Sequence, residues 1–358
     1  MEITLTKVAP EKMKSKPTDE SELGFGKVFT DHFFIMHYTR EKGWHDASIE
    51  PYRPLTLDPA SMCFHYGQEI FEGMKAYYGK DGAVHLFRPE ENIKRMNVSA
   101  ERLCMPTVDK QVFMEAVTRL VLLEKEWIPR GEGTSLYIRP TMIATEPALG
   151  VHASSDYIFF IIVGPVGAYY AHGFGPTKIY VTEEYVRAAV GGVGYCKAAG
   201  NYAASLYATQ KANKMGYAQV LWLDARLHKY AEEVGTSNIF FLIGEELVTP
   251  RLSGSILPGI MRNSVLTMAR SWGVTVTERP VSIDEIMEAH DKGTLLEVFA
   301  SGTAAIVSPV GEIYYKDREY RIKDGTTGPL TERLYREFLD LQYGEKDDPF
   351  GWRITISE

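Results

Sequence analysis

Cysteine is scarce in this sequence, and the few that occur do not form a recognisable site. The three cysteines, Cys63, Cys104 and Cys196, are scattered and odd in number, so they indicate no disulfide framework and favour a reducing cytoplasm. No Cys-x-x-Cys or His-Glu-x-x-His motif occurs, and the nine histidines are dispersed without the spacing of metal ligands. We therefore expect no metal site.

Long apolar runs are also missing. The best candidate, residues 157–166, has only the length of a strand, and residues 1–17 contain no apolar stretch typical of a signal peptide, so no membrane segment is expected. The net charge of −8 argues against a nucleic-acid or anionic-membrane partner. Neither G-x-x-x-x-G-K-[ST] nor G-x-G-x-x-G is present, which excludes a P-loop and a dinucleotide-binding loop.

The composition is that of a soluble globular protein of two domains. The chain has 358 residues, of which 45% are hydrophobic and 24% charged. In the first half, an Asp-Gly turn joins strands at 74–78 and 83–87, Pro89 opens a helix, and a second helix covers 110–127. Strands are predicted at 134–145 and 156–163.

A glycine- and proline-rich stretch, residues 164–177, indicates the break between the domains. Beyond it, strands at 178–181, 218–224, 237–243 and 295–299 alternate with helices after Gly200 and at 261–272 and 330–342. Both halves are therefore mixed α/β. We expect a smaller N-terminal domain at 1–169, an interdomain loop at 170–177 and a larger C-terminal domain at 178–358.

One lysine lies in an unusual environment. Lys197 stands in GGVGYCKAAGNYAASL, residues 191–206, among glycines and alanines. It could be an exposed lysine at the start of a helix. Alternatively, it could form a Schiff base, which requires a deprotonated amine and hence burial or nearby positive charge. Small neighbours would then let a large planar cofactor approach the backbone.

Two further stretches contain groups that could bind such a cofactor. In KYAEEVGTSNIFF, the neighbouring Glu232 and Glu233 point to opposite faces of a strand, so we expect one to face solvent and the other to face inward. A buried carboxylate needs a partner, and a pyridinium nitrogen is one possibility. Two exposed acids at a rim are the alternative. Tyr202 is either a core residue or a partner for a phenolic oxygen.

Anion-binding groups follow. In SILPGIMRNSVLTMAR, residues 255–270, Pro-Gly precedes a helix whose first amides suit a phosphate, and SGTAA at 301–305 is a similar small turn. Tyr137 and Arg139 share one face of a strand and could bind a carboxylate. Alternatively, residues 255–270 are an ordinary junction between a loop and a helix, and Arg139 is a surface arginine stacked on Tyr137. Amine, acid, phosphate site and carboxylate donors together describe a pyridoxal phosphate site.

The same stretches carry a family resemblance. FHYGQEIFEGMKAY, LFRPEENIKRM, GTSLYIRP, GPVGAYY, GGVGYCKAAGNYAASL, EVGTSNIF, ILPGIMRNSVL and SGTAAIVSPV occur in this order. They resemble branched-chain amino-acid aminotransferases, of fold type IV of the pyridoxal phosphate enzymes, from about Phe25 to the C-terminal end. The chain is more similar to the longer, animal-like branch. The resemblance implies a two-domain mixed α/β fold, pyridoxal 5′-phosphate as cofactor, and a homodimer whose partner subunit contributes to the pocket.

The resemblance also implies residue roles. Lys197 is the catalytic lysine that binds the cofactor, Tyr202 contacts the phenolic oxygen of the ring, and Glu233 contacts its nitrogen. The phosphate is implied to be held by Arg95, by Ile260 and Met261 at a helix start, and by Thr303. The implied substrate-binding residues are Thr236 and Ala304 for the α-carboxylate, and Tyr66, Phe71, Tyr137, Arg139 and Tyr169 for the side chain.

The implied reaction is transfer of the amino group of L-leucine, L-isoleucine or L-valine to 2-oxoglutarate. Animal members carry a Cys-x-x-Cys pair where this chain has Ala305 and Ser308, so no thiol switch is expected. Within the fold type, a D-amino-acid aminotransferase or an aminodeoxychorismate lyase would use the same lysine and acid. A non-catalytic pyridoxal phosphate carrier is the alternative from another class of protein.

Overall fold

The computed structural model describes residues 1–167 and 174–357, which form two compact units. Unit 1 comprises Met1–Ala171, Cys196–Ala199 and Leu339–Glu358, and unit 2 comprises His172–Tyr195 and Gly200–Phe338. The C-terminal residues belong to unit 1 because their strand, Arg353–Ile356, pairs with a strand of the sheet in unit 1. The bounds expected from the sequence placed these residues in the C-terminal domain. A domain boundary within residues 170–177 stays a prediction.

Unit 1 is built on a nine-stranded sheet in the order β1-β3-β2-β8-β7-β5-β6-β18, with β4 paired to β7. β1 runs parallel to β3, and the other pairs are antiparallel. The strands are β1 (Thr4–Leu5), β2 (His32–Thr39), β3 (Gly43–Pro51), β4 (Glu69–Phe71), β5 (Met74–Tyr78), β6 (Val84–Phe87), β7 (Ser135–Ala144), β8 (Asp156–Val166) and β18 (Arg353–Ile356).

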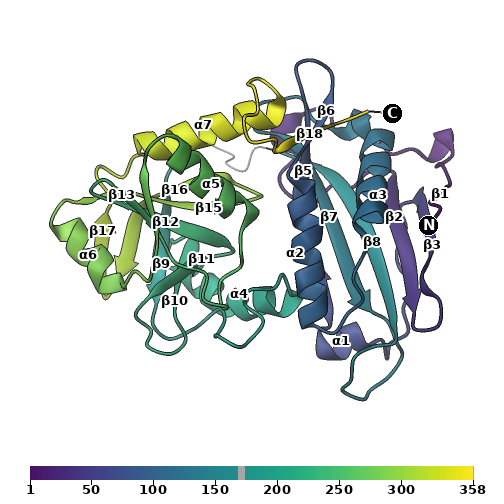
Figure 1. Ribbon diagram of the computed structural model, residues 1–358, viewed down its shortest axis with the longest axis horizontal. Coiled ribbons are helices and arrows are strands. Elements are labelled where there is room, and N and C mark those ends of the chain that lie inside the picture. The colour runs from purple at the N-terminus through teal and green to yellow at the C-terminus, as the bar shows by residue number, and fades with distance from the viewer. Residues whose placement is uncertain (168–173, 358) are drawn as a thin grey trace. The chain divides into compact units, whose positions relative to one another are not determined.

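Helices α2 (Pro89–Arg102) and α3 (Lys110–Leu123) lie beside each other along this sheet (Figure 1). Their apolar sides, with Met96 and Phe113 fully buried, pack on strand residues such as Leu136 and Phe159. Burial of each such side chain stabilises the unit by about 1.5–3 kcal/mol. The smaller elements are α1 (Met62–Tyr66) and the 3₁₀ turns Pro10–Lys12, Glu20–Glu22 and Lys125–Trp127.

Unit 2 contains a sheet that closes on itself. Its order is β11-β10-β9-β16-β15-β12-β13-β14, with β17 paired to β16, and β11 also pairs with β12. Six strands, from β11 round to β12, therefore form a ring. The strands are β9 (Thr177–Thr182), β10 (Gln219–Leu223), β11 (Ala231–Val234), β12 (Ser237–Ile243), β13 (Glu246–Thr249), β14 (Thr275–Glu278), β15 (Leu295–Gly302), β16 (Ile306–Tyr315) and β17 (Arg318–Arg321).

Apolar residues from these strands form the core of unit 2, which includes Ile179, Leu221, Phe241 and Val298. The helices are α4 (Ala199–Lys214), α5 (Ile260–Ser271), α6 (Ile283–Asp291) and α7 (Pro329–Tyr343). The last residues of α7 belong to unit 1. Among the described residues, no helix combines the length and the apolar character that crossing a membrane requires.

Local sequence rules explain several of these elements. The predicted hairpin forms as β5 and β6, with Gly82 at φ +80° in the turn. Pro89 stands in the first turn of α2, as predicted. Asp109 accepts hydrogen bonds from the first amides of α3 and so caps it. The mixed α/β class is confirmed in both units.

A buried carboxylate caps α7 from outside the helix, and its removal should weaken unit 2. Glu297 on β15 accepts hydrogen bonds from the N–H of Leu330 at 3.0 Å and from the N–H and Oγ1 of Thr331 at 2.8 and 2.7 Å. Glu297→Ala should lower the free energy of unfolding by about 2 kcal/mol, measured by urea denaturation. Glu288→Ala, at an exposed ion pair, is the control, and equal stability of both variants would contradict the cap.

Candidate active site

Side chains predicted for the substrate pocket share one face of β7. Leu136 and Ile138 point into the core of unit 1, so the alternating Tyr137 and Arg139 point to the opposite face. Nη2 of Arg139 donates a hydrogen bond to the Tyr137 hydroxyl at 3.0 Å. Its guanidinium carbon lies 4.7 Å from the centre of the Phe71 ring. The structure therefore brings three predicted pocket residues into contact.

The N-terminal segment adds an aromatic ring to this face. The carbonyl oxygen of Val28 passes Gly164 of β8 so closely that a Cβ atom there would lie 2.0 Å from it. Only glycine permits this approach. The same segment carries Phe25, whose ring centre lies 4.8 Å from that of Tyr137 in an edge-to-face arrangement. Sequence reasoning missed Phe25, although a glycine within a strand is a signal of close backbone approach.

Lys75 is a buried amine opposite the same tyrosine. It pairs with Tyr137 across β5 and β7, while its neighbours Met74 and Ala76 face the core. The residue is 6% exposed, and burial lowers the pKa of its ammonium to about 7. This lysine can therefore gain or lose a proton near neutral pH, close to Tyr137.

The main chain of Lys197 extends the edge of β4. Its N–H donates to Ser99 Oγ at 3.0 Å, its carbonyl accepts from the N–H of Phe71 at 3.1 Å, and Ala198 bridges to Ile70. Nζ of Lys197 lies 4.9 Å from the centre of the Phe71 ring. Lys197 is half-buried and precedes α4, so its interpretation as an exposed helix lysine is wrong.

Arg95, expected to bind a phosphate, is itself bound by a buried carboxylate. Its Nε and Nη2 donate to the two oxygens of Glu72 at 2.7 and 2.9 Å, and Asn92 donates to Glu72 at 2.7 Å. Burial raises the pKa of Glu72, but the Arg95 guanidinium, assisted by Lys197 and Asn92, outweighs burial and leaves that pKa lowered. Glu72 thus fixes the orientation of Arg95.

Tyr66 lies in a different environment. It ends α1 and donates its hydroxyl to the carbonyl of Leu149. Phe64, Leu149 and Val151 in the same region are 61%, 68% and 86% exposed, and Tyr66 is 38% exposed. We call these four residues the exposed apolar cluster of unit 1. Tyr169, the remaining predicted pocket residue, lies outside the described residues.

In unit 2, Glu233 lies where the strand ring closes. It pairs with Trp222 of β10 and with Asn238 of β12, and it is 2% exposed. Asn238 Nδ2 donates to Glu233 Oε1 at 3.2 Å, and Arg187 forms an ion pair with Oε2. A buried carboxylate requires such partners, so the interpretation of this residue as an exposed acid is wrong.

The expectation that one of the two neighbouring acids faces solvent is also wrong. Glu232 is 7% exposed, and Ser255 donates a hydrogen bond to its carboxylate. Burial raises the pKa of Glu232, although Ser255 and Arg187 act in the opposite direction. Alternation does separate the two side chains, but both faces of β11 are covered by protein, so neither acid reaches water.

The turns that contain Thr236, Thr303 and Ala304 lie at one end of the sheet. Thr236 stands between β11 and β12, and the other two stand between β15 and β16. β12 and β15 are antiparallel, with Asn238 opposite Ser301. The start of β12 is therefore beside the end of β15, and this register brings the two turns together.

Helix α5 begins close to the same strands. Its N-cap is Gly259, and in the described chain no side chain caps the amides at this end, which belong to Ile260 and Met261. Asn238 Nδ2 donates to the carbonyl of Leu257 at 3.0 Å as well as to Glu233. One asparagine therefore ties the loop before α5 to the carboxylate.

A small pocket in unit 2 collects several of these groups. Tyr202 contributes a phenol, Thr236 a hydroxyl, and Glu233 a carboxylate backed by Arg187; the other lining residues are Asn201, Ser205, Gly235 and Leu257. The uncapped start of α5 follows Leu257 after two residues. This donor set fits a planar ring that carries a nitrogen, a hydroxyl and a phosphate.

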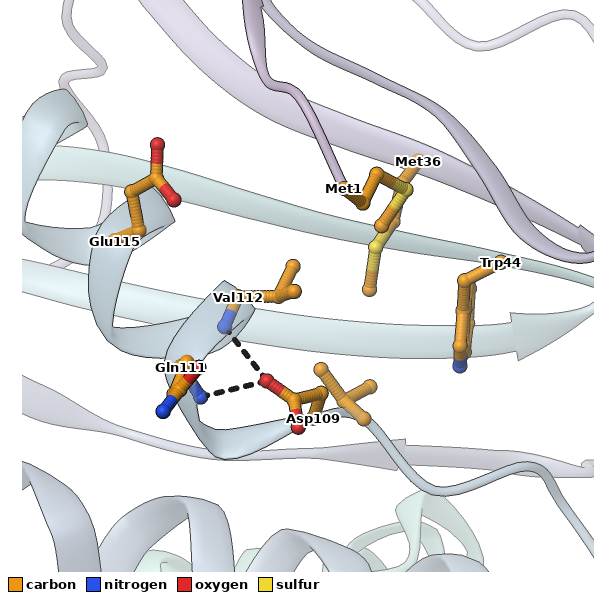
Figure 2. A pocket seen from close by; sticks show the side chains of 8 residues that line it. Met1, Met36, Trp44, Asp109, Gln111, Val112 and Glu115 are labelled. Carbon is orange, nitrogen blue, oxygen red and sulfur yellow. Dashed lines mark hydrogen bonds between the residues drawn. The ribbon is translucent and has the colours of Figure 1, made fainter.

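A larger cavity of about 420 Å³ in unit 1 is lined by none of the predicted site residues. Figure 2 shows it beside the N-terminus and the start of α3, with Met1, Met36 and Trp44 across from Asp109. The Asp109 carboxylate accepts hydrogen bonds from the N–H groups of Gln111 and Val112 at 2.8 and 3.0 Å. This acid therefore serves as the cap of α3.

Sequence reasoning missed the partners that orient the predicted residues. Glu72, Arg187 and Asn238 contact them through long-range hydrogen bonds and ion pairs. Glu72 stands inside the stretch FEGMKAY, yet an acid beside Phe71 has no local pattern that assigns it to Arg95. Arg187 and Asn238 carried no signal at all, because their contacts depend on strand pairing and loop packing.

The chain is similar to known proteins over almost its whole length. A family model described as amino-transferase class IV matches residues 69–313. Branched-chain-amino-acid transaminase 1 of Bacillus subtilis (strain 168) is 55% identical over 344 residues, which is 96% of each chain. A probable branched-chain-amino-acid aminotransferase of Staphylococcus aureus (strain N315) is 54% identical over 347 residues, 97% of this chain and 96% of the relative.

Solved structures agree with the sequence comparisons. A branched-chain amino acid aminotransferase from Escherichia coli has a TM-score of 0.73 and 26% identity, covering 93% of this chain and 100% of its own. The T.th. enzyme of the same name, complexed with N-(5′-phosphopyridoxyl)-L-glutamate, has a TM-score of 0.74 and 26% identity, covering 90% and 98%. The chain therefore belongs to the class IV aminotransferase family, among the branched-chain-amino-acid aminotransferases.

Proposed function

We propose that this protein reversibly transfers the amino group of L-leucine, L-isoleucine or L-valine to 2-oxoglutarate, giving the branched-chain 2-oxo acid and L-glutamate. The observation that carries the proposal is the position of Lys197 Nζ over the Phe71 ring, which also contacts Arg139 and through it Tyr137. An amine beside an aromatic surface, with a cation and a phenol further along, suits an amino acid whose side chain is either aliphatic or carboxylic.

The cofactor of the proposed reaction is pyridoxal 5′-phosphate. When bound, it supplies an aldehyde that carries the amino group and a ring that accepts electrons released at the substrate Cα. We assign Tyr202 to its phenolic oxygen and Glu233 to its ring nitrogen. The phosphate is assigned to Arg95, Thr303 and the amides of Ile260 and Met261. Glu72 takes Nε and Nη2 of Arg95 and so holds the guanidinium in one orientation.

Lys197 is the catalytic residue of this proposal. Its Nζ would hold the cofactor covalently. When it is not bound to the cofactor, the same amine would take the proton from the substrate Cα as a general base and return it as a general acid. Contacts of its main chain with Ser99 and Phe71 keep the backbone in place, so only the side chain has to move in this exchange.

The same pocket must bind two kinds of substrate. We assign Thr236 and the Ala304 amide to the α-carboxylate that all substrates share. The aromatic rings of Phe71 and Tyr137 suit branched aliphatic side chains, while Arg139 suits the second carboxylate of glutamate. Tyr66 and Tyr169 complete the proposed substrate set, and Phe25 joins it through its contact with Tyr137.

We further propose a homodimer in the cytoplasm. The exposed apolar cluster of unit 1 supports self-association, because contiguous exposed apolar groups mark interaction sites. Tyr66 belongs to this cluster. In the proposed dimer, Tyr66 of one subunit would therefore contribute to the substrate pocket of the other. The three free cysteines, Cys63, Cys104 and Cys196, suit a reducing compartment.

Removal of the catalytic amine should abolish the reaction. Lys197→Ala should lower the rate of glutamate formation from L-leucine and 2-oxoglutarate by at least about 10⁴-fold, because it removes both the covalent link and the general base. Lys211→Ala, at an exposed ion pair on α4, is the control. Steady turnover by the Lys197 variant, or a preference of the wild-type protein for D-alanine over L-leucine, would refute the proposal.

Loss of the Glu72 charge should make stability depend on the cofactor. Glu72→Gln removes the carboxylate that pairs with the buried Arg95, which should lower the free energy of unfolding of the cofactor-free protein by about 3 kcal/mol. Bound phosphate replaces part of that charge, so urea denaturation should show a larger stabilisation by pyridoxal phosphate in this variant than in wild type. Glu90→Gln, from an exposed ion pair, should behave like wild type. Equal stabilisation by the cofactor in both proteins would argue against Arg95 as a phosphate residue.

A charge in the exposed apolar cluster should dissociate the dimer. Val151→Asp places a carboxylate where the proposed interface is apolar, so sedimentation velocity at micromolar concentration should show monomers. Leu227→Asp changes an equally apolar side chain, 58% exposed, in unit 2, and should remain dimeric. A dimer that survives Val151→Asp would place the interface elsewhere.

A further inference from the structure

Arg187 is a buried cation that contacts Glu233 of the candidate site and two backbone carbonyls. It lies in the loop after β9, with 7% of its side chain exposed. Its Nη2 donates to the carbonyl of Gly194 at 2.9 Å and to the carbonyl of Ser255 at 2.7 Å. The same guanidinium forms the ion pair with Glu233 and lines the small pocket with Tyr202.

The two carbonyls belong to loops that lead to assigned residues. Gly194 precedes Lys197 by three residues in the chain, and Ser255 precedes the start of α5 by five. The loops touch at Gly194, where a Cβ atom would lie 2.2 Å from the Ser255 oxygen. Buried carbonyl oxygens need a hydrogen-bond donor, and Nη2 of Arg187 is a donor to both of these.

The third contact concerns charge. Glu233 is 2% exposed, and a carboxylate so far from water takes up a proton unless partners hold it ionised. Asn238 supplies a neutral hydrogen bond to Oε1, whereas Arg187 supplies a full positive charge at Oε2. Charge-assisted contacts are about twice as strong as neutral ones, so of these two partners Arg187 contributes more to keeping Glu233 ionised.

We propose that Arg187 is a positioning residue for the cofactor: through Glu233 it keeps the ring nitrogen protonated, and through Gly194 and Ser255 it joins the loops that lead to Lys197 and to the phosphate site. This inference rests on the function proposed above. A carboxylate and a pyridine nitrogen share one proton, which resides on whichever is more basic. A guanidinium in contact with the carboxylate makes the carboxylate less basic, so the proton stays on the nitrogen.

The test uses the ring nitrogen itself as a probe. Wild-type protein and the variants Arg187→Gln and Arg187→Lys are reconstituted with pyridoxal phosphate labelled with ¹⁵N in the ring, and the ¹⁵N chemical shift is measured at about pH 7.5, where free carboxylates are ionised. Wild type and Arg187→Lys should give the shift of a protonated nitrogen, because both retain the charge. Arg187→Gln should give the shift of an unprotonated nitrogen.

Cofactor affinity separates charge from packing. The dissociation constant of pyridoxal phosphate should rise about 10- to 100-fold in Arg187→Gln, as expected for loss of a charged hydrogen bond. In a Glu233→Gln background the same substitution should have a much smaller effect, because the carboxylate on which the guanidinium acts is gone. If Arg187→Gln raised the dissociation constant equally in both backgrounds, Arg187 would not act through Glu233, and the proposal would be overturned.

A matched arginine controls for damage to the fold. Arg262 is equally buried in unit 2, and its Nη2 donates to the carbonyl of Pro250 at 2.9 Å and to Glu278 at 2.8 Å. Arg262→Gln should lower stability but leave the ¹⁵N shift unchanged. A protonated nitrogen in Arg187→Gln would overturn the proposed role of Arg187 but not the proposed function of the protein. Failure of wild type to bind the labelled cofactor would overturn the proposed function, and this inference with it.

Discussion

The need to keep carboxylates ionised away from water governs both groups of site residues. Glu72 in unit 1 and Glu233 in unit 2 are 0% and 2% exposed, and an isolated charge in such a place would be neutralised. Each acid is met by one arginine and one asparagine: Arg95 and Asn92 in unit 1, Arg187 and Asn238 in unit 2. Two unrelated sheets therefore meet the same electrostatic requirement with the same three residue types.

Buried ion pairs add little net stability to a fold, although removing one partner of a pair is costly. Removing two charges from water costs free energy that their attraction does not always return, and apolar replacements are often as stable. The apolar cores of the two units already provide the driving force for folding. The pairs instead fix directions and charges, of Arg95 in one unit and of Glu233 in the other, and both residues are assigned to the cofactor.

The parts of this arrangement that local rules control could be predicted from the sequence. Alternation along one strand placed Tyr137 and Arg139 on one face, and Pro-Gly indicated the start of α5. The alternation rule did not predict the burial of Glu232. It places neighbouring side chains on opposite faces of a strand, but it does not tell whether either face is exposed to solvent. Phe25 and Asn238 escaped because their contacts join residues distant in sequence, through a crossing segment and a strand pair.

The small residues around Lys197 have more than one cause. In the sequence they suggested space for a planar cofactor, but Gly194 is small because the backbone of Ser255 approaches it, and the carbonyls of both residues meet Arg187. Composition cannot distinguish space left for a ligand from space taken by another loop. Arg187 binds the carbonyl of Gly194, and the backbone of Lys197 is hydrogen-bonded to Phe71 of β4. The proposed reaction therefore requires movement of the lysine side chain only, on a backbone that these contacts fix.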